Sequence, residues 1–351
     1  ALVNTALAAK NAYDAVSVGQ GQVSTGKDNP DGSPEMKDGN LADKAGGINA
    51  SISFGSSKSD SSVKMSSSTS VGSDLTAGGD IRITARGNKN EDGSPANGVA
   101  GDITVAGSHI SAGGDVKLTA ADDLNLLASR NDSTQTGSNS SSSASIGVGF
   151  NLGAGGAGVS VNASASKSRG NSNGNDLSWT ETTIQAGNRV DIYSEGDTSL
   201  KGAIVEGKQI VADIGGNLSI ESLQDQSNYD SKRSNSGFSI SVPITGGGRI
   251  GGSVSAGKSK IDSNYQSVVE QSGFKAGDNG FQVTVKGDTD LRGAVIASTD
   301  KAVEEGKNSF KTDGTLTLAS LDNKASYQGK ATGINFGADV KIGRASCRER
   351  V

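Results

Sequence analysis

The sequence predicts an all-β fold in which a parallel β-helix, with about 20 residues per coil, carries long protruding β-hairpin insertions. Three observations indicate this fold. The 351 residues include 51 Gly, only 4 Pro and only 4% aromatic residues, which is typical of short strands joined by tight turns. Aliphatic residues recur at intervals near 20. The decapeptide GDTSLKGAIV at 196–205 returns as GDTDLRGAVI at 287–296, so a longer repeat is superimposed on the short one.

The N-terminal part of the chain has a different pattern. Apolar residues over 1–18 step by four and three, which predicts a short amphipathic helix. Residues 19–46 are rich in Gly, Asp, Pro and Asn, and we interpret them as a linker. The chain begins with Ala1 and shows no signal peptide, so we expect it to be an internal piece of a longer protein.

The coils of the β-helix are expected over 74–128, 181–225 and 273–323. LTAGGDIRITA at 75–85 returns as ISAGGDVKLTA at 110–120, a glycine turn that leads into a short alternating strand. Leucine-rich repeats and a Ca²⁺-binding β-roll fit less well, because the leucine spacing of the one and the GGxGxD repeat of the other are missing. Three pairs of aliphatic residues, each 20 residues apart, are expected to point inward and to stack: Ile184 with Ile204, Val190 with Ile210, and Leu200 with Ile220.

Long insertions of another character interrupt the coils. Residues 143–170 and 237–260 each read as an alternating strand, a glycine-rich reversal and a second alternating strand, and 47–66 and 331–341 look like further hairpins. The predicted segments are therefore a hairpin with coils over 47–128, 129–225 and 226–330, and the start of a further hairpin from 331. The apolar faces of the two long hairpins comprise Ile146, Val148, Phe150 and Leu152 in one, and Phe238, Ile240, Val242 and Ile244 in the other.

These apolar faces are the candidate functional site, and two arrangements are open. In the first, each face packs on the solenoid or on a neighbouring hairpin. In the second, the hairpins pair edge to edge against lipid or a partner, with small polar residues on the other side. Membrane β-strands need about 9–11 residues of alternation and full backbone pairing.

Charge and cysteine content limit the possible partners. Residues 342–351 break the local pattern and contain Cys347, the only cysteine, and we interpret them as a translated sequencing-adapter scar. The whole chain has a net charge of −5; without this tail, 30 basic and 37 acidic residues give −7. An acidic chain whose cations are dispersed along the sequence is a poor candidate for binding nucleic acid.

No set of residues predicts an enzyme, a cofactor or a metal site. Residues 252–259, GSVSAGKS, match the phosphate-loop formula, but they lie in a predicted hairpin strand and not between a strand and a helix. His109 is the only histidine, so a catalytic triad has little to build on. Asp122, Asp123 and Asp213 could contact Ca²⁺ but are more typical of turns. Trp179 is expected to plug the junction between a hairpin and a coil.

The long motifs resemble a known family. The AGGD-aliphatic coils, NLLASRNDST, GKQIVADIGGNLSIESLQD, EQSGFKAGD and GAVIASTDKAVEEGKNS resemble the haemagglutinin-repeat region of filamentous-haemagglutinin-type proteins, over about residues 1–341. The closest resemblance is to two-partner-secretion exoproteins, including CdiA-type effectors of contact-dependent growth inhibition.

The resemblance implies a right-handed β-helix that is secreted to the surface of Gram-negative cells through an outer-membrane transporter. It further implies delivery of a C-terminal toxin across the outer membrane of a target cell. A filamentous adhesin that binds a surface receptor is the alternative, and a polysaccharide-active enzyme on the same fold is a remote one.

Overall fold

The structure is a computed structural model that describes residues 20–28, 34–40, 48–88, 90, 100–153, 156–245 and 249–341. The helix predicted over 1–18 and the tail at 342–351 lie outside these residues. The described chain consists of β-strands and one short helix, α2 (Asp300–Glu304), so the predicted all-β class is confirmed. No helix in this described part is long and apolar enough to cross a membrane.

The segment interpreted as a linker contains two strands. β1 (Gln20–Asp28) and β2 (Pro34–Asn40) pair antiparallel, with Gln20 opposite Asn40. The predicted linker over 19–46 is therefore corrected to an antiparallel strand pair. The sequence of β1 lacks the regular apolar alternation on which a sequence-based strand assignment depends.

Three parallel six-stranded sheets form what we call the three-sheet stack. Consecutive strands belong to the first, second and third sheet in turn, and we call such a set of three a coil. The first sheet contains β4 (Asp74–Ala77), β7 (His109–Ala112), β12 (Thr182–Ala186), β15 (Ala203–Gly207), β20 (Gly273–Ala276) and β23 (Val295–Ala297). The second contains β5 (Ile81–Ala85), β8 (Val116–Ala120), β13 (Arg189–Ser194), β16 (Gln209–Ile214), β21 (Phe281–Val285) and β24 (Ser309–Thr312). The third contains β6 (Ile103–Ala106), β9 (Leu124–Leu127), β14 (Thr198–Lys201), β17 (Leu218–Glu221), β22 (Thr289–Arg292) and β25 (Leu316–Ala319).

The core lies inside this stack, where aliphatic side chains of successive coils lie on one another. Val190 pairs with Ile210 and Leu200 with Ile220, as the period of 20 predicts, and all four are fully buried. The remaining predicted pair is corrected: Ile184 lies opposite Val205, and Ile204 is buried but faces Thr183. The cause is a connection between β15 and β16 that is one residue shorter than that between β12 and β13.

Asp and Asn side chains hold the corner between the second and third sheets. The Oδ1 atom of Asp123 accepts a hydrogen bond from the backbone N–H of Asp197 at 2.8 Å. Asp197 accepts in the same way from Asn217 at 2.7 Å, and Asn217 from Asp288 at 2.8 Å. Each coil therefore satisfies a backbone donor of the next coil. Asp123, considered above as a Ca²⁺ ligand, has this structural role.

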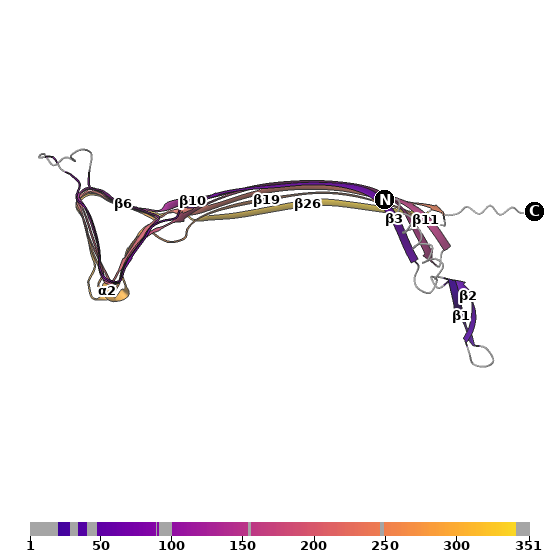
Figure 1. Ribbon diagram of the computed structural model, residues 1–351, viewed down its shortest axis with the longest axis horizontal. Helices are drawn as coiled ribbons and strands as arrows, with labels where there is room; N and C mark the ends of the chain where they lie inside the picture. Colours follow the sequence, from indigo (N-terminus) through magenta and orange to yellow (C-terminus); the bar gives the residue numbers. More distant parts are fainter. Residues whose placement is uncertain are drawn as a thin grey trace, which may run out of the picture.

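The fourth six-stranded sheet is antiparallel and extends away from one corner of the stack (Figure 1). Its strand order is β26-β19-β18-β11-β10-β3. The bounds are β3 (Ile48–Ser68), β10 (Ser129–Gly153), β11 (Gly156–Thr180), β18 (Gln224–Thr245), β19 (Arg249–Val268) and β26 (Lys324–Lys341). We call it the antiparallel sheet.

Two details of the predicted hairpins are corrected. The segment 47–66 is no hairpin: it belongs to the single strand β3, which pairs with β10 from Ile48 to Ser68. The two long hairpins also begin earlier and end later than predicted, with 25 residues in each of β10 and β11. Their Ser- and Asn-rich flanks continue as strand because polar side chains on neighbouring strands pair across the sheet.

Coils and hairpins alternate in a fixed ratio. Two coils follow β3, two follow the β10–β11 hairpin and two follow the β18–β19 hairpin. Strands within a sheet lie about 4.8 Å apart, so two coils and the two strands of one hairpin both rise by about 9.6 Å. Successive hairpins therefore leave the same corner at the spacing that lets their edges pair.

Candidate functional site

The predicted residues of the first hairpin lie on one face of the antiparallel sheet. Ile146, Val148 and Phe150 alternate along β10 and have exposed fractions of 60%, 37% and 44%. Their partners on β3 are Phe54, Ile52 and Ala50. Leu152 continues the same backbone register, opposite Ile48. In the described part of the chain the side chains of Ile146, Val148 and Phe150 are exposed, so this face is open there.

The predicted residues of the second hairpin join them on the same face. Phe238, Ile240 and Val242 of β18 lie opposite Ala165, Ala163 and Val161 of β11. Phe238 and Ile240 are 51% and 43% exposed. Ile244 departs from the predicted alternation, because the register with β11 shifts between Val159 and Ser160. Pro243, which has no N–H to donate, lies at this irregularity.

Pairing of the hairpins creates one continuous apolar surface, which we call the apolar face. One row runs from Phe54 through Ile146 and Ala163 to Ile240, and the next from Ala165 through Phe238 and Val254 to Phe336. Phe54, Val254 and Phe336 are 56%, 58% and 68% exposed and were not among the predicted site residues. An exposed apolar patch of this kind marks an interaction surface.

The opposite face of the same strands carries small polar residues. Ser145 and Ser164 hydroxyls form a hydrogen bond of 2.8 Å across β10 and β11, and so do Ser143 and Ser166. Ser239 and Ser253 repeat this bond between β18 and β19. The antiparallel sheet is therefore amphipathic, with hydroxyl ladders behind the apolar face.

Cations that are scattered in the sequence come together next to the apolar face. The register places them in three adjoining rows, which we call the basic band: Lys58 and Lys167; Arg169 and Lys258; Lys232, Lys260 and Lys330. The interpretation of the basic residues as dispersed is therefore wrong for this sheet. Recurrent Lys-Ser patterns, such as KSR at 167–169 and KSK at 258–260, were the available signal.

The strand pairing of residues 252–259 bears on their match to the phosphate-loop formula. Residues 252–259 lie inside β19, between the antiparallel neighbours β18 and β26. A phosphate loop needs a strand that turns into a helix N-terminus, and this segment has no such turn. Lys258 instead projects from the face that carries Phe238 and Arg169.

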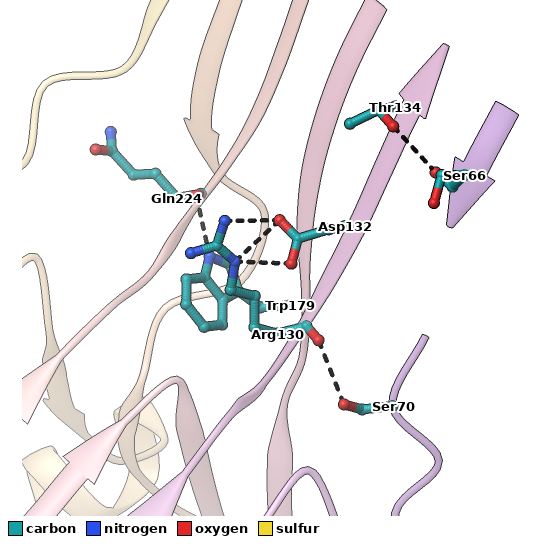
Figure 2. A network of polar contacts seen from close by, with 7 residues as sticks. All are labelled: Ser66, Ser70, Arg130, Asp132, Thr134, Trp179 and Gln224. Carbon is teal, nitrogen blue, oxygen red and sulfur yellow. Dashed lines mark hydrogen bonds and ion pairs between the residues drawn. The ribbon is translucent and has the colours of Figure 1, made fainter. Parts of the chain in front are cut away.

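A polar network joins the strands at the base of the antiparallel sheet (Figure 2). The guanidinium of Arg130 donates to both carboxylate oxygens of Asp132, at 2.6 to 3.0 Å. Trp179 is the strand partner of Arg130, and its indole N–H donates to the carbonyl of Gln224 at 3.2 Å. Trp179 thus joins the two hairpins where they meet the coils, and it is half-buried.

His109 lies on β7 in the first sheet of the stack, far in sequence from the residues above. Its Nδ1 atom contacts the hydroxyl of Thr183 on the neighbouring strand β12. The imidazole is therefore part of the inter-coil contacts.

Comparison with known proteins agrees with these features. The family model described as Hemagglutinin repeat matches residues 54–236 and 230–334. The chain is 42% identical over 296 residues to a protein named Toxin CdiA from Escherichia coli, covering 84% of this chain and 9% of that protein. It is 40% identical, over 84% of this chain and 8% of the relative, to Deoxyribonuclease CdiA of Dickeya dadantii. No solved structure matches the chain.

The chain thus spans less than a tenth of the length of these two relatives. The two family matches together run through all six coils and every strand of the antiparallel sheet. The chain belongs to the hemagglutinin-repeat family.

Proposed function

We propose that the chain is part of a large exoprotein of Gram-negative bacteria, exported through an outer-membrane transporter and displayed at the cell surface. In this proposal the three-sheet stack is a right-handed parallel β-helix that serves as a stalk. The antiparallel sheet contacts the outer membrane of a target cell during delivery of a toxin carried C-terminal to the repeats. Two relatives named as a toxin and a deoxyribonuclease support toxin carriage by the longer protein. The repeat region itself is not catalytic.

The apolar face is the observation that carries this proposal. Burying exposed apolar surface is favourable by about 25 cal/mol per Å², so Phe and Ile side chains left in water favour contact with an apolar partner. The apolar rows of β10 run from Ala144 to Leu152. Nine strand residues span about 30 Å, which is similar to the hydrocarbon thickness of a bilayer.

The amphipathic sheet suits a lipid surface better than a protein groove. The apolar side chains repeat over six strands and present a broad face, while the hydroxyl ladders of the opposite face remain in water. Any strand placed within the hydrocarbon also needs its backbone groups paired. The inner strands β10, β11, β18 and β19 have neighbours on both sides, and β3 and β26 form the two edges.

Flotation of the chain with neutral phosphatidylcholine vesicles tests the proposal. Val148→Asp with Phe150→Asp places two charges on the apolar face, and we expect this variant to lose vesicle association. The matched control is Ser51→Asp with Ser53→Asp, which adds the same charges at the same level on the opposite face. We expect the control to float like the unmodified chain.

Circular dichroism and limited proteolysis check that both variants retain the stack. Equal flotation of the apolar-face variant and its control would overturn lipid contact by this face. Failure of the unmodified chain to float with any vesicle, together with binding to intact cells, would instead support the adhesin alternative with a surface receptor.

A further inference from the structure

The basic band is a second feature of the same sheet face, and the proposed function above gives it no role. Its seven cations come from strands β3, β11, β18, β19 and β26. On the opposite face of the same rows, in the described residues, the only cation is Arg233. A chain with a net charge of −5 therefore concentrates positive charge on the face that is also apolar.

Three members of the band are partly neutralised by neighbouring carboxylates. Lys58 lies 3.4 Å from Asp60, Lys232 lies 3.8 Å from Asp230, and Lys260 lies 2.7 Å from Asp262. The hydrogen bond that Lys260 donates to the carboxylate of Asp262 raises the pKa of Lys260 above its usual value, so this side chain stays protonated.

The other four cations are unpaired. Among the described residues, no carboxylate forms an ion pair with Lys167, Arg169, Lys258 or Lys330, and all four side chains are exposed. A shallow cavity of about 1080 Å³ lies over the band. Its lining includes serine and asparagine side chains, the carboxylate residue Asp60, which pairs with Lys58, and five cations of the band: Arg169, Lys232, Lys258, Lys260 and Lys330. Unpaired cations and hydroxyls around an open hollow are suited to phosphate oxygens.

The position of the band favours a membrane surface as the source of the phosphate groups. Lys167 is two residues from Ala165 and Lys258 is four residues from Val254, so the band directly adjoins the apolar rows. Adjacent rows on one strand face lie about 6.8 Å apart, which lies within the reach of Lys and Arg side chains. A surface that is apolar on one side and phosphate-rich along its border is the boundary between acyl chains and head groups.

We propose that the basic band binds the phosphate groups of anionic lipid head groups while the apolar face contacts the acyl region. This inference rests on the proposed function, because it assumes that the apolar face meets lipid. The inference adds to the proposed function a preference for anionic membranes. It also fixes how deeply the sheet enters the bilayer, because the band lies level with the head groups.

Vesicles of phosphatidylcholine with and without phosphatidylglycerol test the inference. The variant carries Gln at positions 167, 169, 258 and 330 (K167Q, R169Q, K258Q and K330Q). The matched control also replaces three Lys and one Arg by Gln, at exposed positions on the stack that form no ion pair with another described residue: Arg82→Gln, Lys117→Gln, Lys208→Gln and Lys286→Gln. Each cation near an anionic surface strengthens binding to it, so we expect the band variant to bind anionic vesicles at least ~10-fold more weakly.

The expected pattern separates this inference from the proposed function. The band variant should bind neutral vesicles as the unmodified chain does, and the control should keep its preference for anionic vesicles. Equal losses in the band variant and the control would overturn the inference, since a general charge effect would explain both. Loss of vesicle binding by V148D/F150D without any effect of the band variant would leave lipid contact standing and would reject the band.

A single-stranded oligonucleotide serves as a second anionic probe. An oligonucleotide that binds more tightly than anionic vesicles, and whose binding is lost on the four Gln substitutions, would overturn the assignment to lipid. We expect weak oligonucleotide binding, because the band lacks interleaved aromatic side chains on which bases could stack.

Discussion

Glu181 connects the β10–β11 hairpin to the coil that begins with β12, between Thr180 and Thr182. Burial raises the pKa of this carboxyl to about 7, and repulsion from the carboxylate of Glu270 adds to the effect, whereas Lys275 opposes it. Lys275 is engaged elsewhere, since it forms an ion pair of 2.7 Å with Glu270. A carboxyl group that is difficult to ionise therefore lies at the base of the antiparallel sheet.

The Glu181 carboxyl predicts a pH dependence of stability. Its pKa in the folded chain, about 7, lies above the ordinary value of 4.5, so the folded state holds the proton more tightly than the unfolded state. The contribution of protonated Glu181 to the free energy of unfolding is fully present below about pH 4.5 and is lost as the pH rises towards 7. We expect Glu181→Gln to raise the thermal midpoint relative to the unmodified chain above pH 7, with little difference at pH 4.5.

Thermal unfolding followed by circular dichroism between pH 4.5 and 8 measures this difference. Glu304→Gln is the control, because Glu304 lies exposed on α2, away from the hairpin base. A Glu181 variant that matches this control across the whole range would contradict the assignment.

At the scale of elements, the short strands of the stack were predictable and the long strands were only partly so. The AGGD turns mark β5 and β8, and aliphatic alternation marks these two strands and β13, because each has a buried and an exposed side. Apart from Leu177 and Trp179 near the end of β11, the polar halves of β10 and β11 have no apolar residues to set a period, so sequence patterns end the predicted hairpin too early. Their strand conformation depends on pairing between residues that are distant in sequence, such as Thr134 and Asn175.

The candidate site shows the same limit. Alternation within one hairpin predicted that Ile146, Val148 and Phe150 share a face. That this face continues through Ile240 to the residues of β19 and β26 depends on the register between hairpins, which no local pattern contains. The basic band was missed for that reason: Lys58 and Lys167 are 109 positions apart but lie on opposite sides of Ser142.

The column of the third sheet that contains Leu200 predicts how stability varies along the stack. Leu200 is fully buried between Leu126 and Ile220, whereas Leu318 at the end of the same column is 69% exposed. Leu200→Ala should lower the free energy of unfolding by about 2–5 kcal/mol, because it leaves a cavity that neighbouring coils fill only partly. Leu318→Ala should cost less than about 1 kcal/mol.

Urea titration of both variants measures these costs. The Leu318 variant is the matched control, since it removes the same atoms from the same column. Equal shifts in the two midpoints would show that the coils do not form a continuous core at Leu200.

The whole molecule depends on the equal rise of two coils and one hairpin, and this ratio predicts which deletions the fold accepts. Removing 182–202 takes out one coil and joins residue 181 to Ala203, the partner of Thr182 in the first sheet. The stack can close over this deletion, but the two hairpins then leave the corner about 4.8 Å too close together. We expect the antiparallel sheet to lose its pairing between β11 and β18 while the stack persists.

Removal of 183–272 is the control for that deletion, because it takes out two coils and one hairpin together. It joins Thr182 to Gly273, which is the counterpart of Thr183 in the first sheet through Ile204, so the shortened chain should keep both kinds of sheet, with β26 on β11. Hydrogen exchange of the β11 amides distinguishes the two: protection should fall in the first deletion and remain in the second. Equal protection in both would show that the antiparallel sheet forms independently of coil number.

The shared rise also restricts how a gene for such a protein can lengthen. Duplication of a DNA segment that encodes two coils and one hairpin yields a chain in which every new strand finds a neighbour. Duplication of a segment with another ratio of coils to hairpins leaves the strands of a coil or of a hairpin without a neighbour at the required spacing. Unequal recombination between the stretches that encode GDTSLKGAIV and GDTDLRGAVI adds or removes one such unit, because the two copies occupy equivalent corners, each with a left-handed glycine, Gly202 or Gly293. The geometry of the corner therefore implies that such a gene lengthens or shortens by whole units of two coils and one hairpin.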